Sequence, residues 1–536
     1  SPTLREITVP LSPEHFAAHE ALRAQVGGKV VIDSAFPQQA HLSPAYLARA
    51  REAAREADVV IFSHPWVHPL VKDSLDRRRQ LVVYDAHNVE GMLRMSLLDD
   101  GGQGAQIVRD VIRVEKELCH EADVVVACSK EELLLFHELY GVPLRKLRLS
   151  PNGVFTERVR PASPQERAQH KRRLEIFHPN AAIFIGSGYR FNIEAAEYII
   201  RDIAPRLPSV LFVIAGGVGG CLSDFLFQQG PATNVRITGL LSDEEKASYL
   251  AACDIGLNPM FGGSGTNIKM FDYLAAGIPV VTTEIGARGI DEIGETAFLA
   301  EPAGQFMDSI NLLLHHPTVW RQMSRAARRL ARDLYSWERI SRNLGILLGR
   351  ERAHLGNKRP FFSIIVPTYE RHGHLAVLAD ALKRQEEKNF EVVVVDQSAQ
   401  PWGGAGLESG LDLLYIHTEV RGAVIARNLG AFLARGDVLA FTDDDCTPDP
   451  GWLLNSRPYF DRPEVVGVEG YIRSAGLGDP NYRSVTNEGL AGLGFKTANL
   501  LVRADAFQLV GGFDTRFDQP HFREDTDLGW RLQELG

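Results

Sequence analysis

The stretch GDVLAFTDDDC, residues 436–446, sets the fold and the chemistry of the C-terminal third of the chain. Its apolar run, Val438 to Phe441, predicts a buried β-strand that runs directly into three consecutive carboxylates. Open α/β sheets bind ligands at the edge where such strands end. Two unit charges about 4 Å apart repel by roughly 4 kcal/mol at an effective dielectric of about 20, so three clustered carboxylates need a cation or must hold a proton. A hard divalent ion such as Mg²⁺ or Mn²⁺, shared with a substrate phosphate, meets this need; the alternative is an acidic loop that faces water.

The composition is that of an ordinary globular chain, with 45% hydrophobic and 24% charged residues, and the length predicts three or four domains. A net charge of −10 argues against a nucleic-acid partner. The sequence has no apolar run of membrane-spanning length and no signal peptide, and its five cysteines lack metal-type spacing. We therefore expect a cytoplasmic protein with reduced thiols. Because the chain begins at Ser and stops just after a helix-like segment, we expect a fragment of a longer protein.

Strand-like and helix-like segments alternate along the first two units, which predicts parallel sheets covered by helices on both faces. In residues 1–155 the β-branched runs that predict strands are 29–33, 57–63, 80–85 and 123–129. In residues 156–349 they are 182–186, 210–215, 235–238, 255–259 and 279–283. Residues 350–360 are polar and contain Gly and Pro, so we expect a linker there. A third α/β unit follows at 361–536, and we expect it to be truncated.

The third unit carries six short motifs in order: PTY at 367–369, Asp396 after a run of four valines, ARNLG at 426–430, DDD at 443–445, GFD at 512–514 and EDTDL at 524–528. A carboxylate at the end of a buried strand, such as Asp396, can accept hydrogen bonds from a base or a ribose. A carboxylate within reach of an acceptor hydroxyl can take its proton.

These motifs, which cover nearly all of residues 361–536, resemble glycosyltransferase family 2, a family with the GT-A fold. The resemblance implies nucleoside-diphosphate-sugar donors and an inverting, metal-dependent transfer. Thr368 and Asp396 would hold the nucleoside and Asp444 would lie near the ribose. Asp443 and Asp445 would lie near the diphosphate and bind Mg²⁺ or Mn²⁺.

The same resemblance makes Asp525 the general base, with Glu524 beside it. The alternative for residues 524–527 is an N-terminal helix cap, which can coexist with catalysis. Arg427 is either a donor-binding residue or a plain cation on the helix surface.

The second unit contains GGSGTNIK at 262–269, followed by a helical pattern. Glycines before a helix start form an anion site, because free backbone N–H groups meet the positive end of the helix dipole. Lys269 adds a point charge for a diphosphate, and Asp272 lies three residues further on nearly the same face. The alternative is that this loop is only a turn.

This segment resembles the donor-binding region of glycosyltransferase family 4, which has the two-domain GT-B fold. Supporting matches, over about residues 55–340, are GSGYRFN at 186–192, AGG at 215–217, GL at 239–240 and YDAHNVE at 84–90. The resemblance implies a retaining transfer that needs no metal. The donor would be bound by Arg190, Gly265, Thr266, Asn267, Lys269 and Asp272.

The resemblance also places His87 near the sugar, in the cleft between the two domains. A structural loop histidine is the alternative for His87, and His64 and His68 are rival candidates. The sequence departs from the family in two places. Asp272 stands where a second glutamate is usual, with Ser264 at the earlier acidic position, and no glycine-rich loop is evident before Lys29.

We expect a dual glycosyltransferase that adds sugars to a growing surface glycan, either an oligosaccharide or a lipid-linked chain, in the cytoplasm. The alternative is a single active GT-A enzyme whose GT-B half is a glycan-binding or scaffolding module. A nucleotidyltransferase, which also uses a metal-binding Asp pair, is a rival from another class. The arginine-rich segment 321–332 is read as a solvated helix face, with contact to anionic lipids at the inner face of the membrane as the alternative.

Overall fold

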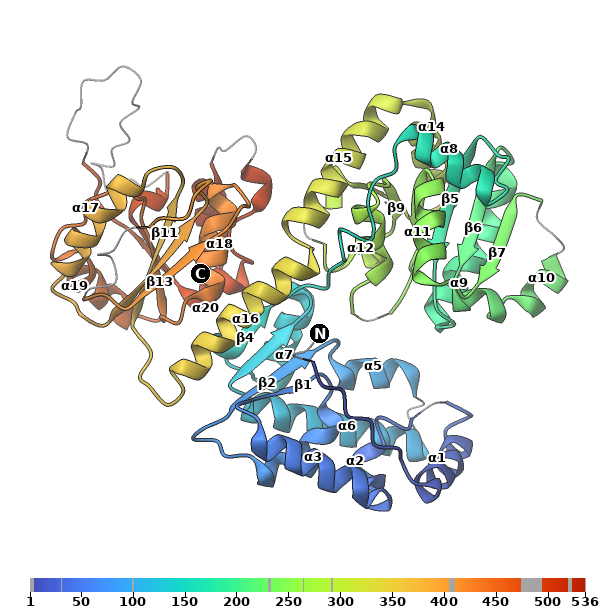
Figure 1. Ribbon diagram of the computed structural model, residues 1–536, viewed down its shortest axis with the longest axis horizontal. Coiled ribbons are helices and arrows are strands. Elements are labelled where there is room, and N and C mark those ends of the chain that lie inside the picture. Colours follow the sequence, from blue (N-terminus) through green and yellow to red (C-terminus); the bar gives the residue numbers. More distant parts are fainter. Residues whose placement is uncertain are drawn as a thin grey trace. The chain divides into compact units, whose positions relative to one another are not determined.

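The computed structural model of the chain describes residues 4–29, 31–98, 101–229, 233–263, 265–290, 293–403, 410–473, 494–518 and 523–535. It divides into two compact units (Figure 1). The first holds residues 1–142 and 146–348, and the second holds residues 349–536 with residues 143–145. Helix α16 (Trp337–Ala353) ends inside the expected linker 350–360. The domain boundaries expected from the sequence stay predictions.

The N-terminal sheet is parallel throughout and has the strand order β1-β2-β3-β4. Its central strands β2 and β3 are almost wholly buried, as their runs of apolar residues predict. The strands are β1 (Val59–Phe62), β2 (Leu81–Ala86), β3 (Val124–Ala127) and β4 (Leu147–Leu149). The helices are α1 (Pro13–Gln25), α2 (Phe36–Gln39), α3 (Pro44–Glu56), α4 (His68–Val71), α5 (Glu90–Leu97), α6 (Gly102–Glu121) and α7 (Lys130–Tyr140).

The strand predicted at 29–33 is wrong. The chain leaves α1 through Gly27 and Gly28, whose φ angles are 66° and 78°, and then turns rather than extends. Asp33 reinforces the turn, because its carboxylate accepts a hydrogen bond from the N–H of Ser34 at 2.7 Å. Of this segment, the described residues Lys29 and 31–33 form a loop and turn and not a fifth strand, and Val30 lies outside the described residues.

The second sheet is also parallel throughout, in the order β10-β9-β8-β5-β6-β7. The strands are β5 (Asn180–Ile185), β6 (Val210–Ala215), β7 (Val235–Gly239), β8 (Ile255–Asn258), β9 (Val280–Thr282) and β10 (Ala297–Leu299). The five strands predicted in this unit are confirmed as β5 to β9. Alternate residues of β5 and β6 enter two different hydrophobic cores, so both faces are covered.

This strand order is the doubly wound one, in which the winding direction reverses between β5 and β8. The helices of this region are α8 (Pro164–Arg173), α9 (Arg190–Tyr198), α10 (Ser223–Gln229), α11 (Asp243–Ala252), α12 (Ile268–Ala275), α13 (Glu284–Ala287), α14 (Ala303–His315), α15 (Pro317–Asp333) and α16 (Trp337–Ala353).

The arginine-rich segment 321–332 lies in α15 and is largely the solvated face that its sequence predicts. Arg328 differs, because its guanidinium donates to the main-chain carbonyls of Thr156, Val159 and Ala275 at 3.0–3.1 Å. This arginine therefore anchors α15 to its neighbours. Among the described residues, no helix combines the length and the apolar character needed to cross a membrane.

The third sheet is mixed, with the order β13-β12-β11-β14-β16-β15. Strands β11 to β14 are mutually parallel, and β16 runs antiparallel to β14 and β15. The strands are β11 (Phe362–Thr368), β12 (Phe390–Asp396), β13 (Leu413–His417), β14 (Val438–Phe441), β15 (Gly467–Glu469) and β16 (Leu500–Arg503). The helices are α17 (His372–Lys383), α18 (Ala423–Leu433), α19 (Trp452–Ser456), α20 (Ala504–Leu509) and α21 (Glu524–Gln533). The opening stretch forms the central strand β14, as predicted, and the winding reverses between β11 and β14.

Helix α18 approaches β11 closely at Gly430, where an added Cβ would lie 2.5 Å from Cγ2 of Ile365. Gly430→Ala should therefore destabilise the second unit by about 1–3 kcal/mol, although alanine is the better helix former. The measurement is urea denaturation of the full chain, followed by hydrogen exchange of the β11 amides.

Gly345→Ala in α16 is the matched control, because nothing lies within 4 Å of its added Cβ. It should stabilise its helix by about 0.5–1 kcal/mol. Equal effects of the two substitutions would contradict the packing argument.

Candidate active sites

The acidic loop of the C-terminal sheet lies where theory places a ligand crevice. Strands β11 and β14 are parallel neighbours at the point where the winding reverses, so their carboxyl ends share one edge. Thr368 ends β11 and donates a hydrogen bond from Oγ1 to Oδ2 of Asp444 at 2.6 Å. Both side chains are buried. The structure thus joins two motifs that lie 76 residues apart in the sequence.

The three consecutive carboxylates have different partners. Asp443 accepts from Nη2 of Arg427 at 2.9 Å, whereas Nη1 of Arg371 lies 2.9 Å from Asp445 and 3.3 Å from Asp444. Arginine charge therefore meets part of the demand for cations that three adjacent carboxylates create. The sequence analysis did not single out Arg371 in this role.

A cluster suited to a metal ion involves Asp444, Asp445 and His374. Their ligand atoms all lie within 4.8 Å of one another. The predicted metal pair was Asp443 and Asp445; Asp445 belongs to the cluster, and Asp443 lies against Arg427 instead. Carboxylate oxygens suit Mg²⁺ and Mn²⁺, and an imidazole nitrogen favours a transition metal such as Mn²⁺ over Mg²⁺. The residues present therefore fit a divalent cation.

Arg427 is buried, with only 5% of its side chain exposed, so it is not the plain surface cation considered above. In addition to Asp443, its guanidinium contacts Glu524 at 3.3 Å, and Glu524 is likewise buried. One arginine thus links the acidic loop after β14 to the first turn of α21. Whether it contacts a donor stays a prediction.

Asp525, the predicted general base, lies half-buried in the first turn of α21. Burial and the neighbouring Glu524 raise the pKa of Asp525 above its ordinary value, against hydrogen bonds from Thr526. A raised pKa makes a carboxylate a better proton acceptor near neutral pH. Its bond from the N–H of Thr526, at 2.6 Å, lies within the first turn, where the helix dipole favours acidic side chains. The role of Asp525 as general base stays a prediction.

Asp396, the predicted nucleoside ligand, is fully buried at the end of β12. Its carboxylate accepts from the N–H of Ser398 and from His372, both at 2.9 Å, and from the hydroxyl of Tyr415. Burial alone would raise the pKa of Asp396, but the hydrogen bonds from Ser398 and Tyr415 outweigh it and lower the pKa. This carboxylate is therefore charged and rigidly held, and a nucleoside would share it with three protein donors.

In the second sheet the winding reverses between β5 and β8, and the segments that follow these two strands hold most of the predicted donor residues. Lys269 lies in the first turn of α12, with Nζ 2.8 Å from Oδ1 of Asn192 and 3.1 Å from Oδ1 of Asn258. Burial of its ammonium group lowers the pKa of Lys269 to about 7. Its hydrogen-bonding oxygens in the described chain are amides, which leave its charge uncompensated.

The loop before α12 is shaped by close contacts. Gly265 has a φ of 71°, and an added Cβ would lie 2.4 Å from the side-chain oxygen of Asn88. Thr266 accepts a hydrogen bond from Asn152 at 2.6 Å. Asn267 precedes the helix without capping it through its side chain, whereas its carbonyl accepts from the N–H of Met270 at 2.9 Å. The N–H groups of Ile268 and Lys269, for which the described residues provide no such acceptor, could meet an anion. Ser264 lies outside the described residues.

Two other predicted donor residues are paired with protein groups. Arg190 contacts Glu194 at 2.8 Å on the surface of α9, with 73% of its side chain exposed. Asp272 forms an ion pair with Lys246 of α11 at 3.1 Å, and burial raises the pKa of Asp272 against the effect of this lysine. Sequence reasoning did not identify Lys246, because the pairing joins helices that are 26 residues apart.

His87 is exposed after β2, and its ring lies 5.5 Å from that of His64. Nδ1 of His64 lies 3.1 Å from a carboxylate oxygen of the buried Glu90, a hydrogen bond that raises the pKa of His64. His68 is fully buried against Glu121, so it is a structural residue rather than a rival. His64 remains beside His87 at the same sheet edge.

Glu115 was missed from the sequence, although it organises this loop. It is fully buried on α6 and accepts from the hydroxyls of Tyr84 and Tyr140 at 2.7 Å and from the N–H groups of Glu90 and Gly91 at 2.8 Å. It therefore caps α5, the helix that follows His87, from a distance. The available signal was a charged residue within the apolar stripe of α6.

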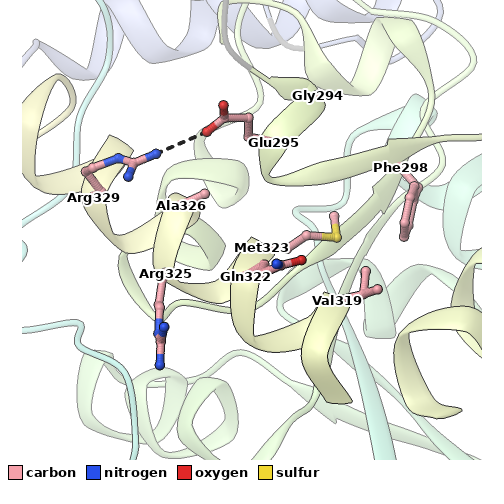
Figure 2. A pocket seen from close by; sticks show the side chains of 9 residues that line it. All are labelled: Gly294, Glu295, Phe298, Val319, Gln322, Met323, Arg325, Ala326 and Arg329. Atoms are coloured by element: carbon pink, nitrogen blue, oxygen red, sulfur yellow. Dashed lines mark hydrogen bonds and ion pairs between the residues drawn. The ribbon is translucent and has the colours of Figure 1, made fainter. Parts of the chain in front are cut away.

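A separate cavity of about 470 Å³ lies between α15 and residues 294–298 (Figure 2). Figure 2 shows Phe298, Val319 and Met323 along it, and the ion pair of Arg329 with Glu295 at its side. None of the predicted site residues lines it. We therefore assign the candidate sites to the two sheet edges and not to this cavity.

Comparison with known families matches three successive regions of the chain. Residues 8–158 match Glycosyltransferase Family 4, residues 179–316 match Glycosyl transferases group 1, and residues 363–522 match Glycosyl transferase family 2. The two resemblances drawn from motifs are thus confirmed.

Among curated proteins, the chain is similar to Glycosyltransferase AglE of Haloferax volcanii, at 29% identity over 32% of this chain and 64% of that protein. It is also similar to a Pre-mycofactocin glycosyltransferase of Mycobacterium tuberculosis, at 31% identity over 43% of this chain and 52% of that protein. The chain therefore spans less than two thirds of these relatives. A solved sucrose-phosphate synthase from Thermosynechococcus elongatus aligns at a TM-score of 0.49 and 19% identity, over 58% of this chain and 79% of that one. On the family matches, the chain is a glycosyltransferase in which family 4 and group 1 regions precede a family 2 domain.

Proposed function

We propose that the chain is a dual glycosyltransferase that uses nucleoside-diphosphate sugars at two separate sites. The GT-B half transfers with retention and without a metal, and the GT-A half transfers with inversion and with Mg²⁺ or Mn²⁺. The acceptor is a growing surface glycan, which both sites extend in the cytoplasm. The observation that carries the proposal is the chemistry at each sheet edge: a partly buried lysine that contacts amide oxygens in one, and three adjacent carboxylates beside two arginines in the other.

In the GT-A half, Asp444, Asp445 and His374 would hold the divalent cation, which supplies positive charge to the departing diphosphate. Asp525 takes the proton from the acceptor hydroxyl, and its raised pKa suits this task. Arg427 keeps the acidic loop and the first turn of α21 together through its two ion pairs.

In the GT-B half, Lys269 and the free N–H groups of α12 bind the diphosphate. His87, exposed at the end of β2, faces the sugar. The alternative, a GT-B half that only binds or scaffolds the glycan, is favoured by the ion pairs that already engage Asp272 and Arg190.

Release of nucleoside diphosphate from the full chain separates these functions. With a panel of UDP, GDP and dTDP sugars, Asp445→Ala or EDTA should abolish one donor activity by at least a hundredfold and leave the other intact. Lys269→Met should show the reverse pattern. If Lys269→Met changed no activity, the scaffolding alternative would hold; transfer of a nucleotide instead of its release would indicate a nucleotidyltransferase.

Proton uptake gives a second test, specific to Lys269. Its pKa of about 7 means that, before a ligand binds, the amino group of Lys269 is mostly neutral at pH 8. A bound diphosphate favours the ammonium form and raises this pKa, so binding should take up as much as about one proton at pH 8 and less at pH 6. Calorimetry in buffers of different ionisation enthalpy measures this uptake, with EDTA present to exclude the metal-dependent site.

In Lys269→Met the uptake should vanish and the affinity should fall at least tenfold. Unchanged uptake in this variant would show that the lysine does not meet the diphosphate.

A further inference from the structure

Arg371 occupies the place where the divalent cation is expected. Its Nη1 lies 2.9 Å from Asp445 and 3.3 Å from Asp444, and these two carboxylates belong with His374 to the candidate metal cluster. A guanidinium and a divalent ion repel each other, so they do not share the same two carboxylates at full occupancy. Binding of the ion therefore requires this arginine to change partners.

The local structure lets the side chain of Arg371 move while its backbone stays in place. The preceding residue, Glu370, adopts a left-handed φ of 56°. It is held there from both ends: its N–H donates to Ser398 at 2.8 Å, and its carboxylate accepts from the N–H of Ala399 at 2.8 Å. The Arg371 side chain is 49% exposed, and within the described residues its guanidinium forms ion pairs with these two carboxylates.

Arg427 provides a contrast within the same site. It is 5% exposed and paired with the buried Glu524 and with Asp443, whose side chain is 35% exposed, so its departure would break an ion pair of a buried carboxylate. Of these two arginines, Arg371 is the one whose release costs less, because its guanidinium and Asp445 are both partly exposed and an incoming cation would replace it beside the buried Asp444.

We propose that Arg371 is the counter-ion of the metal-free site and becomes a diphosphate-binding residue when the metal is bound. The incoming divalent ion takes Asp444 and Asp445, and the displaced guanidinium, still tethered beside them, binds the diphosphate of the donor. Phosphate oxygens match the planar fork of an arginine as well as carboxylates do. This inference rests on the proposed function of the GT-A half.

Mn²⁺ binding to the full chain, measured by the electron paramagnetic resonance of free Mn²⁺, tests the first step. Without nucleotide, Arg371→Met should bind Mn²⁺ at least threefold more tightly than the wild type, because a competing cation is gone. Arg384→Met, an exposed arginine at the other end of α17, is the matched control and should not change the affinity.

Binding of UDP, GDP and dTDP at saturating Mn²⁺, measured by calorimetry in a Lys269→Met background, tests the second step. Arg371→Met should weaken each diphosphate that binds by at least tenfold, and the corresponding monophosphate by less than threefold. If the proteins with and without Arg371→Met had equal affinities for Mn²⁺ and equal affinities for the diphosphates, the exchange of partners by Arg371 would be wrong, and the proposed metal requirement would stand. Absence of Mn²⁺ binding in both would overturn the proposed metal requirement and the exchange with it.

Discussion

Parallel strands end at a common edge, and both candidate sites depend on this constraint. Where the winding of a sheet reverses, two neighbouring strands send their chains to opposite faces and leave an open crevice between them. In the second sheet this reversal brings the segment after β5 beside the segment after β8. In the third it brings Thr368 against the acidic loop after β14. Residues far apart in sequence thus meet without any loop having to be long.

The second and third sheets carry opposite kinds of charged group at the edges where their strands end. One favours an anion, since the partly buried Lys269 contacts amide oxygens and lies in the first turn of α12, at the positive end of the helix dipole. The other concentrates negative charge, which Arg371 and Arg427 compensate in part. A diphosphate can bind the first directly, whereas it can approach the second only together with a cation. Under the proposed function, this difference in charge is the reason that the GT-A half would need a metal ion and the GT-B half would not.

The sequence predicts strands well and charge partners poorly. Buried apolar runs identified β5, β6, β8, β9 and β14, because burial on both faces leaves a continuous hydrophobic pattern, whereas the edge strand β7 is only partly buried. The same signal failed at 29–33, because Gly27 and Gly28, which have positive φ angles, turn the chain just before this segment. The roles of Arg371, Lys246 and Glu115 could not be predicted from spacing, because their partners lie 24 to 74 residues away. Only Glu115 left a local sign, a charge within an apolar helix stripe.

The ion pairs of Arg427 bear on how the GT-A site should be understood. The sequence offered a choice between a donor ligand and a surface cation, yet the buried side chain joins Asp443 to Glu524. Those carboxylates belong to the acidic loop and to the turn that carries Asp525, so the arginine fixes the distance between the diphosphate region and the proposed base. Its loss would remove an ion pair from each of two carboxylates, one of them buried, and would displace both regions together. A fall in activity on removing Arg427 would therefore indicate that the acidic loop and the turn of Asp525 had shifted. It would indicate a direct contact between Arg427 and the donor only if the pKa of Asp525 stayed raised, because that would show that the turn had kept its place.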